Sequence, residues 1–200
     1  QWIRHRTANV NEYSGRYSVM KEEFYVPQPK DIRLQSSNNR QGRSEAEAPP
    51  EIRQKFLDYL NRSQTEAYAA YNEFLEADIA RELARINLPL SMYTEWYWKI
   101  DLHNLFHFLQ LRLDEHAQEE IRVYAEVMAG MVRTVCPVAY EAFADYRLNS
   151  VLFSRPELAV LQENLSHMTL TVEQLTARGL SKREAVEFIE KLDKTKRPTD

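Results

Sequence analysis

The chain has 200 residues, 44% of them hydrophobic and 28% charged, with a net charge of −4, so it can bury one sizeable core and is too acidic for general nucleic-acid binding. It shows no signal-like start and no apolar run near the roughly 18 residues that span a bilayer, which argues against a membrane partner. Cys136 is the only cysteine; this excludes an intrachain disulfide and a cysteine-based zinc site, and it fits a cytoplasmic protein.

Basic and polar residues are concentrated in the first segment, QWIRHRTANVNEYSGRY, over residues 1–17. Arginine guanidinium groups match phosphate oxygens in pairs and stay charged when desolvated. Glu12 can orient an arginine, Ser14 adds a hydroxyl, and Gly15 lets backbone N–H groups approach a ligand closely. The segment is too polar for a core strand. It predicts an anion-binding site, with a solvated basic turn as the alternative.

Residues 20–50 predict a strand followed by a loop. The run EEFYV, within residues 20–26, is aromatic and β-branched, and the prolines at 27 and 29 close it. Residues 30–50 are polar and predict a mobile loop, which is either disordered or a lid over a site.

Helices are expected from Pro50 onward. Apolar residues that recur three and four apart predict one long amphipathic helix over 51–77 and a shorter one from about Asp78 to Arg85, which ends before Pro89. Residues 91–100, SMYTEWYWKI, are aromatic and β-rich, and they predict a strand or extended segment.

Two aspartates are placed to cap helices. Asp101 precedes the segment LHNLFHFLQLR, and Asp114 precedes a helix expected over 116–135. The apolar stripe that we expect to face the core in the second helix consists of Ile121, Tyr124, Met128, Met131 and Val135.

The carboxyl end predicts two short helices with a structural role. Thr171 and Gln174 form a capping box, Gly179 ends the first helix, and Ser181 with Glu184 opens the second. The whole pattern predicts an α+β fold, mostly helical, with a small antiparallel sheet from the segments around 13–26 and 91–100 and helices packed against it. Residues 1–147 are expected to form one domain, and 148–200 a helical extension of it.

His103 and His107 lie four residues apart and therefore share one helical face. This spacing permits a metal, but the HExxH motif needs Glu after the first His, and here Asn104 stands there. Two histidines with ordinary hydrogen bonds remain the simpler interpretation.

Two motifs resemble those of the flavin-dependent thymidylate synthases. The first is Arg4-His5-Arg6 followed after seven residues by Ser14, with Gln1-Trp2 before it and Gly15-Arg16-Tyr17-Ser18 after it. Asn9 departs from the Ser of many members. The second is Arg85 with the spaced set Asp101, His103, His107 and Arg112. Together the motifs cover most of residues 1–143, and the resemblance implies that an amino-terminal portion normally precedes them.

The resemblance implies FAD as cofactor, no metal, and the substrate dUMP. The implied FAD contacts are Arg4, His5, Arg6, Glu12, Asp101, Leu102, His103 and His107. The implied dUMP contacts are Gln1, Trp2, Ile3, Arg4, Glu12, Tyr13, Ser14, Gly15, Arg16, Arg85 and Arg112.

The implied reaction is the reductive methylation of dUMP to dTMP, with 5,10-methylenetetrahydrofolate as carbon donor and NADPH as reductant. Arg112 is expected to be catalytic, because a cation beside the uracil N3–C4 edge favours the anionic ring. Cys136 lies in an apolar context that makes a thiol inert, and Ser14 lacks an evident base. The resemblance also implies a homotetramer with sites at subunit interfaces. The alternatives are a non-catalytic nucleotide- or phosphate-binding module and a His-dependent metalloprotein.

Overall fold

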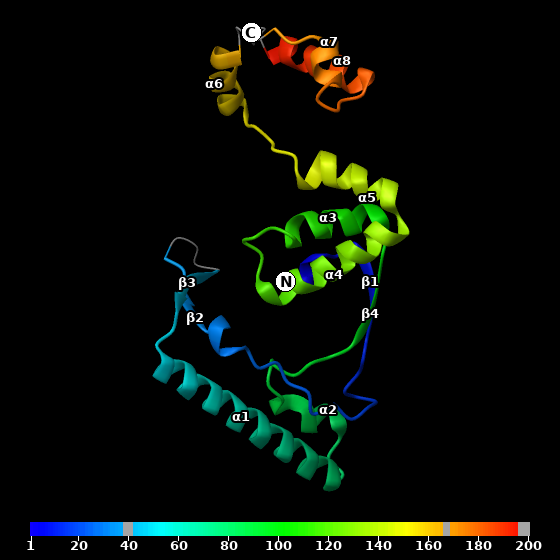
Figure 1. Cartoon of the computed structure of the whole chain (residues 1–200). Coiled ribbons are helices and arrows are strands. Elements are labelled where there is room, and N and C mark those ends of the chain that lie inside the picture. Colours follow the sequence, from blue (N-terminus) through cyan, green and yellow to red (C-terminus); the bar gives the residue numbers. More distant parts are fainter. Residues whose placement is uncertain (38–41, 166–168, 196–200) are drawn as a thin grey trace. The chain divides into compact units, whose positions relative to one another are not determined.

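The computed structural model describes residues 1–37, 42–165 and 169–195. The chain divides into two compact units, residues 1–141 and 142–200, so the boundary expected at 147 lies inside the second unit (Figure 1). Among the described residues, no helix combines the length and apolar character needed to cross a membrane.

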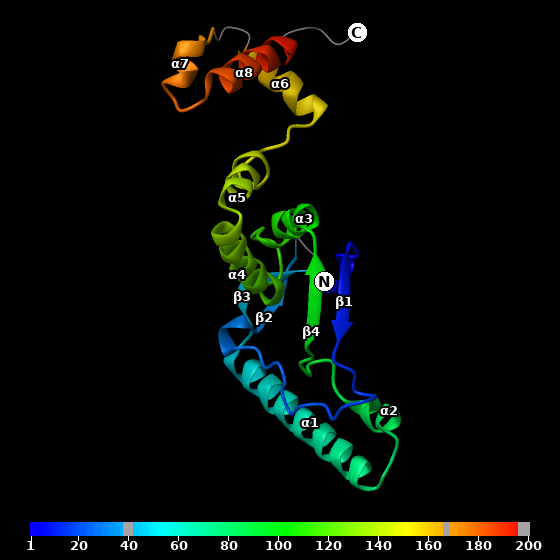
Figure 2. The same cartoon turned by 90° about the vertical axis from the view of Figure 1, so that its right-hand side faces the viewer.

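The first unit is built around an antiparallel strand pair, β1 (Ala8–Glu12) and β4 (Trp96–Ile100), which lie side by side in Figure 2. The register pairs Ala8 with Ile100 and Glu12 with Trp96. The predicted α+β class with a small antiparallel sheet is therefore confirmed, and residues 91–100 supply one of its strands.

The other predicted strand segment, residues 13–26, is corrected. It contributes only an isolated bridge between Phe24 and Met92, whereas the ladder uses β1, inside the segment we judged too polar for a core strand. The reason is that β1 is mostly exposed, so its polar side chains stay in water. Ser14 O accepts from the backbone N–H groups of Tyr17 and Ser18 at 3.1 and 3.0 Å, and this turn interrupts the extended backbone after β1.

The loop expected over 30–50 contains a second antiparallel pair, β2 (Arg33–Gln35) and β3 (Arg43–Glu47). The loop prediction is wrong for these strands. Their residues are mostly charged or polar and exposed, as in short edge strands. A search for alternating apolar residues therefore does not detect these strands. The part of the prediction that falls on residues 38–41 lies outside the described residues.

The long predicted helix is confirmed as α1 (Pro50–Glu76), which starts with proline at its first position. The next helix, α2 (Arg81–Ala84), begins later than expected, because Asp78 has φ 60° and breaks the helical path. A 3-10 turn, Arg85–Asn87, follows α2 directly.

The helix α3 (Leu102–Arg112) is capped as predicted, since the Asp101 carboxylate accepts from the backbone N–H of Asn104 at 3.0 Å. The cap expected from Asp114 is wrong. Asp114 accepts from the backbone N–H of His116 at 2.8 Å, in a turn that precedes α4 (Glu119–Val135).

The stripe expected to face the core in α4 is confirmed at Ile121 and wrong at Tyr124, Met131 and Val135. The buried residues are Ile121, Ala125 and Ala129, which are spaced by four and lie on one helical face. Tyr124, Met131 and Val135 are 50, 62 and 77% exposed. Helical periodicity identified the apolar residues, but small side chains were needed where α4 packs closely.

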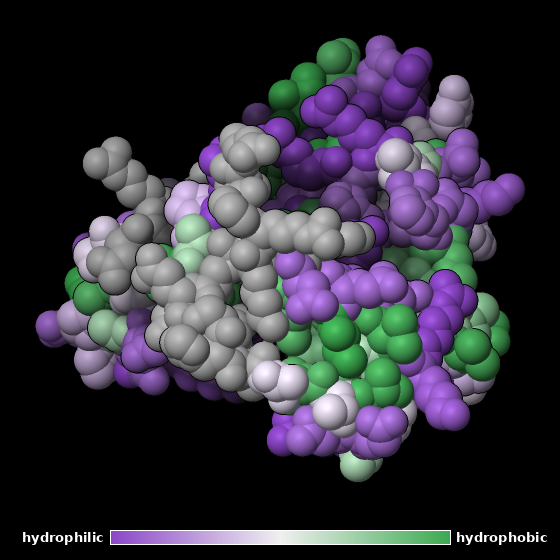
Figure 3. All heavy atoms as spheres, turned by 90° about the horizontal axis from the view of Figure 1, so that it is seen from above, coloured by the Kyte–Doolittle hydropathy of each residue, from purple (hydrophilic) through white to green (hydrophobic). Residues whose placement is uncertain are grey.

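The second unit is helical. It contains a π-helical turn (Ala144–Leu148), α6 (Arg155–Leu165), α7 (Val172–Thr176) and α8 (Lys182–Thr195), while α5 (Pro137–Phe143) crosses the unit boundary. The capping box of Thr171 with Gln174 is confirmed, as is the stop at Gly179, whose φ is 99°. Large apolar side chains are exposed in both units, and the face drawn in Figure 3 shows apolar patches between hydrophilic groups.

Two tyrosines of α1 hold the chain just after the Ser14 turn. The buried Tyr71 hydroxyl accepts from the backbone N–H of Met20 at 3.1 Å, and the Tyr68 hydroxyl donates to Met20 O at 2.9 Å. Met20 Sδ in turn lies against Gly15, 2.9 Å from where a Cβ would stand. The phenol groups therefore fix the position of the turn relative to α1.

We predict that Tyr71→Phe lowers the free energy of unfolding by about 1–3 kcal/mol, because the Met20 N–H loses its acceptor in a buried place. Chemical denaturation measures this loss. Tyr59→Phe is the matched control, since the Tyr59 ring is 64% exposed and its hydroxyl loss should change little. Equal stability of the two variants would contradict the proposed fixing of Met20.

Candidate functional site

An aromatic cluster fixes the start of the chain. The Trp2 ring contacts the rings of Trp96, Trp98, Phe108 and Tyr124, with centroids 5.3 to 5.8 Å apart. These contacts attach the first residues to β4, α3 and α4. The Trp2 ring is used in packing, and its buried indole N–H has no hydrogen-bond partner among the described residues; the predicted substrate contact of Trp2 stays a prediction.

Arg112 is held at the end of α3 by two neutral acceptors. Its Nε donates to His5 Nε2 at 3.0 Å, and its Nη1 donates to Gln1 Oε1 at 3.3 Å. The His5 ring packs edge-on against Phe108. Burial, then the charges of Arg112 and His107, lower the pKa of His5 below its usual 6.5. A neutral His5 with its proton on Nδ1 is consistent with this geometry.

The other residues predicted to bind FAD lie at the same end of the β1–β4 pair. Asp101, Leu102, His103 and His107 are in the cap and first turns of α3, which follows Ile100, the partner of Ala8. Side-chain and backbone hydrogen bonds from Asn104 lower the pKa of Asp101 and keep it charged. Arg4 and Arg6, just before β1, are exposed, as is Ile3. We use the name Arg112 cluster for Gln1, His5 and Arg112 together with Arg4, Arg6, Asp101, Leu102, His103 and His107.

A second cluster lies at the other end of β1, where residues Ser14 to Arg16 meet Arg85. A Cβ on the buried Gly15 would stand 3.2 Å from Cδ and 3.3 Å from Nη1 of Arg85, so a larger residue here would push the Arg85 side chain outward. Arg16 Nε lies 3.4 Å from a Glu82 carboxylate oxygen, in an exposed pair. Arg81 Nη1 donates to Tyr17 O at 3.1 Å. We use the name Arg85 cluster for residues Ser14 to Arg16 together with Arg85.

The five-residue strand β1 separates the two clusters. At about 3.3 Å per residue it spans ~16 Å, which is more than a uracil ring bridges. Glu12 and Tyr13 lie next to the Arg85 cluster, and the Tyr13 N–H donates to Glu95 O at 2.8 Å. The structure therefore brings Gly15 against Arg85 and Arg16 against Glu82, whereas Arg112 lies at the other end of β1 in the same chain.

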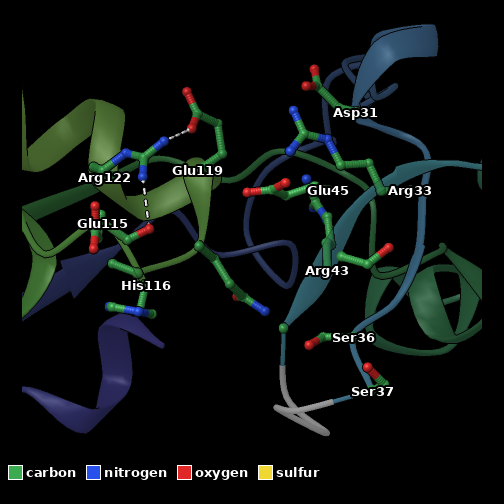
Figure 4. Close-up of a pocket in the computed structure, with 14 residues that line it drawn as sticks. Asp31, Arg33, Ser36, Ser37, Arg43, Glu45, Glu115, His116, Glu119 and Arg122 are labelled. Carbon is green, nitrogen blue, oxygen red and sulfur yellow. Dashed lines mark hydrogen bonds and ion pairs between the residues drawn. The ribbon is translucent and has the colours of Figure 1, made fainter.

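A polar cavity of about 800 Å³ lies between the β2–β3 pair and the start of α4 (Figure 4). Its arginines largely have partners of their own, since Arg43 pairs with Glu120, and Arg122 with Glu119. Burial and a hydrogen bond to Glu120 raise the pKa of Tyr25 to about 12. The Tyr25 hydroxyl therefore keeps its proton and donates it in a hydrogen bond to the Glu120 carboxylate. Sequence reasoning missed the cavity, because its walls come from distant segments.

The histidine pair gains no support as a metal centre. Over the part of the chain that the structure describes, no group of three or more His, Cys, Asp or Glu side chains is arranged to hold a metal ion. His107 instead acts electrostatically on His5, and His103 on Asp101.

Comparison with known proteins supports the motif assignment. Residues 1–138 match the family model described as "Thymidylate synthase complementing protein". The flavin-dependent thymidylate synthase of Treponema denticola is 53% identical over 192 residues, an alignment that covers 96% of this chain and 69% of the relative. The enzyme of the same name from Dictyostelium discoideum is 52% identical, with 96% of this chain and 59% of the relative covered.

Solved structures agree with these relatives. The UMP/dUMP methylase PolB from Streptomyces cacaoi, bound with 5-Br dUMP, is 31% identical with a TM-score of 0.63, over 72% of this chain and 64% of that protein. The same methylase bound with 5-Br UMP gives 32% identity and a TM-score of 0.67, over 75% and 69%. The resemblance read from the two motifs is thereby confirmed, and the chain belongs to the flavin-dependent thymidylate synthase family.

Proposed function

We propose that this chain carries the nucleotide-binding and flavin-binding part of an enzyme that converts dUMP to dTMP. The cofactor is FAD, the carbon donor is 5,10-methylenetetrahydrofolate, and the reductant is NADPH. Family membership supports the methyltransferase class, and the bound 5-Br dUMP of the Streptomyces methylase supports the substrate. The assignments of individual residues stay predictions, as does a cytoplasmic location.

The observation that carries this proposal is the uncompensated charge of Arg112. Its described hydrogen-bond partners, His5 and Gln1, are both neutral acceptors. No described ion pair joins Arg112 to a carboxylate, in contrast to Arg16, Arg43 and Arg122. A guanidinium that is oriented but not neutralised retains its full charge for an anionic ligand.

Uracil C5 is a poor nucleophile unless electron density is pushed into the ring. A cation beside the N3–C4 edge lowers the pKa of the N3–H group and stabilises the ring anion. Arg112 is suited to this role because its partners hold its guanidinium in one plane. The protein thus stabilises the charge that develops in the substrate.

The Arg85 cluster is suited to the phosphate of dUMP. The Ser14 hydroxyl, the backbone at Gly15 and the Arg16 guanidinium provide donors in one turn, and Arg85 adds a second guanidinium from beside Gly15. The Arg16–Glu82 pair is exposed, so exchange of Glu82 for a phosphate costs little. Glu12, the last residue of β1, can accept from a sugar hydroxyl.

The flavin is proposed to lie beside the Arg112 cluster. The donor set there, with Arg4, Arg6, His103 and His107, fits the phosphates and ring carbonyls of a dinucleotide. FAD supplies hydride transfer when it is bound, whereas the chain itself supplies orientation and charge.

A complete site requires a second copy of the chain, since one copy keeps Arg112 away from Arg16 and Arg85. An apolar face suited to such an assembly is present on α4 and the start of α5. Its exposed members are Tyr124, Val127, Met131, Val135 and Val138. Large exposed apolar patches mark interfaces. We propose that copies pair through this kind of surface in a homotetramer with shared active sites.

The direct test is turnover by the full-length protein, followed as dTMP formation from dUMP with FAD, methylenetetrahydrofolate and NADPH. We predict that Arg112→Ala lowers kcat by about 100-fold or more while FAD stays bound, because the transition-state charge loses its partner. Arg133→Ala, an exposed arginine of α4, is the matched control and should keep normal turnover. A wild-type protein that binds dUMP but never forms dTMP would favour the non-catalytic module.

We predict that the acid limb of the pH profile depends on His5. Because its pKa is lowered, His5 is neutral above pH 6.5 and accepts the hydrogen bond from Arg112 there. This hydrogen bond is lost when His5 gains a proton, as pH falls from 6.5 through the lowered pKa. In His5→Gln, the amide oxygen still accepts from Arg112 but does not titrate. The variant should therefore keep kcat as pH falls through the lowered His5 pKa, where the wild type declines. Identical acid limbs in both proteins would show that His5 does not control Arg112.

A further inference from the structure

We propose that Gln118 is a positioning residue for Arg112 and acts through Gln1. This inference rests on the catalytic role proposed for Arg112. Gln118 Oε1 accepts a hydrogen bond from Gln1 Nε2, and Gln1 Oε1 accepts from Arg112 Nη1 at 3.3 Å. The relay thus joins the start of α4 to the end of α3 through the first residue.

The relay fixes which end of the Gln1 amide faces Arg112. An amide has an acceptor oxygen on one side and a donor NH2 on the other, and the two orientations differ only by a flip. A flipped Gln1 would present its NH2 to the guanidinium, where two donors oppose each other. The guanidinium of Arg112 only donates and therefore takes the Gln1 oxygen, and Gln118 Oε1 holds Gln1 in that same orientation by accepting from its NH2.

Gln118 is exposed at the start of α4, where its backbone is fixed and its side chain is free of capping duty. It is the N-cap residue of α4, a position where Ser, Thr, Asp and Asn are preferred because their side chains cap the helix. The Gln118 side chain makes no cap hydrogen bond and is used in the relay instead. Its carbonyl accepts from the N–H groups of Ile121 and Arg122 at 3.1 and 3.0 Å, which fixes its backbone.

Two independent supports therefore orient the guanidinium of Arg112. His5 holds Nε and is packed on Phe108, while Gln1 holds Nη1 and is oriented by Gln118. If one support is lost, Arg112 can rotate about the remaining hydrogen bond. Its charge would then average over several positions and lower the pKa of uracil N3 less.

The test compares Gln118→Leu with Gln118→Glu in the full-length protein. The leucine side chain has a similar size but no acceptor, and we expect kcat to fall about tenfold with the FAD affinity unchanged, as for the loss of one oriented hydrogen bond. The ascending limb of the kcat profile, where kcat rises as uracil N3 loses its proton, should move to higher pH. The Glu variant keeps an acceptor for Gln1 Nε2 and should restore kcat to near the wild-type value. Gln54→Leu, a surface control on α1, should behave as wild type.

A double-mutant cycle separates the relay from a general effect. In the Gln1→Leu background, Gln118→Leu should cause no further loss of kcat, because both changes break the same path. A full additional loss, or a wild-type kcat and pH profile for Gln118→Leu in an active enzyme, would overturn the positioning role. Absence of dTMP formation by the wild type would instead remove the proposed function. In that case the relay is tested by a double-mutant cycle in which the unfolding free energies of Gln118→Leu, Arg112→Ala and the double variant are compared. Effects of the two changes that simply add would show that the residues are not coupled and would overturn the relay.

Discussion

The antiparallel pairing of β1 with β4 is the constraint on which the rest of the first unit depends. Its register places Ala8 beside Ile100 and Glu12 beside Trp96. His5, before β1, is thereby brought to Arg112 at the end of α3, and Gly15, after β1, is brought to Arg85. Two groups of arginines that are neighbours in the sequence become separate half-sites, since the extended backbone keeps them apart.

The two half-sites differ in how their charge is managed. In the Arg85 cluster, Gly15 lies against Arg85, and Arg16 forms an exposed ion pair with Glu82. Arg16 can therefore exchange Glu82 for a phosphate without loss of a buried interaction. Arg112 is oriented by the neutral groups of His5 and Gln1, which leaves its charge available. Such an arrangement suits a group that must stabilise a transient anion.

Much of the local structure could be predicted, because it depends on residues close in sequence. The Asp101 cap, the Thr171 capping box and the stop at Gly179 need only a few neighbours. The resemblance predicted Arg112 and His5 as site residues, but not their contact, which joins positions 107 apart. The strand in residues 8–12 and the buried face of α4 were missed, because edge position and helix packing are tertiary properties that hydrophobic periodicity does not record. The role of Gln118 had no local signal at all.

The most direct measurement is complementation between two inactive variants, Arg85→Ala and Arg112→Ala, expressed together in one cell. If each active site takes Arg112 from one copy and Arg85 from another, mixed oligomers contain some sites with both arginines intact. Random pairing of two copies then predicts recovery of about a quarter of wild-type dTMP formation, while each variant alone is inactive. Mixed oligomers that form but stay inactive would contradict the claim that the two half-sites of this chain are joined across subunits.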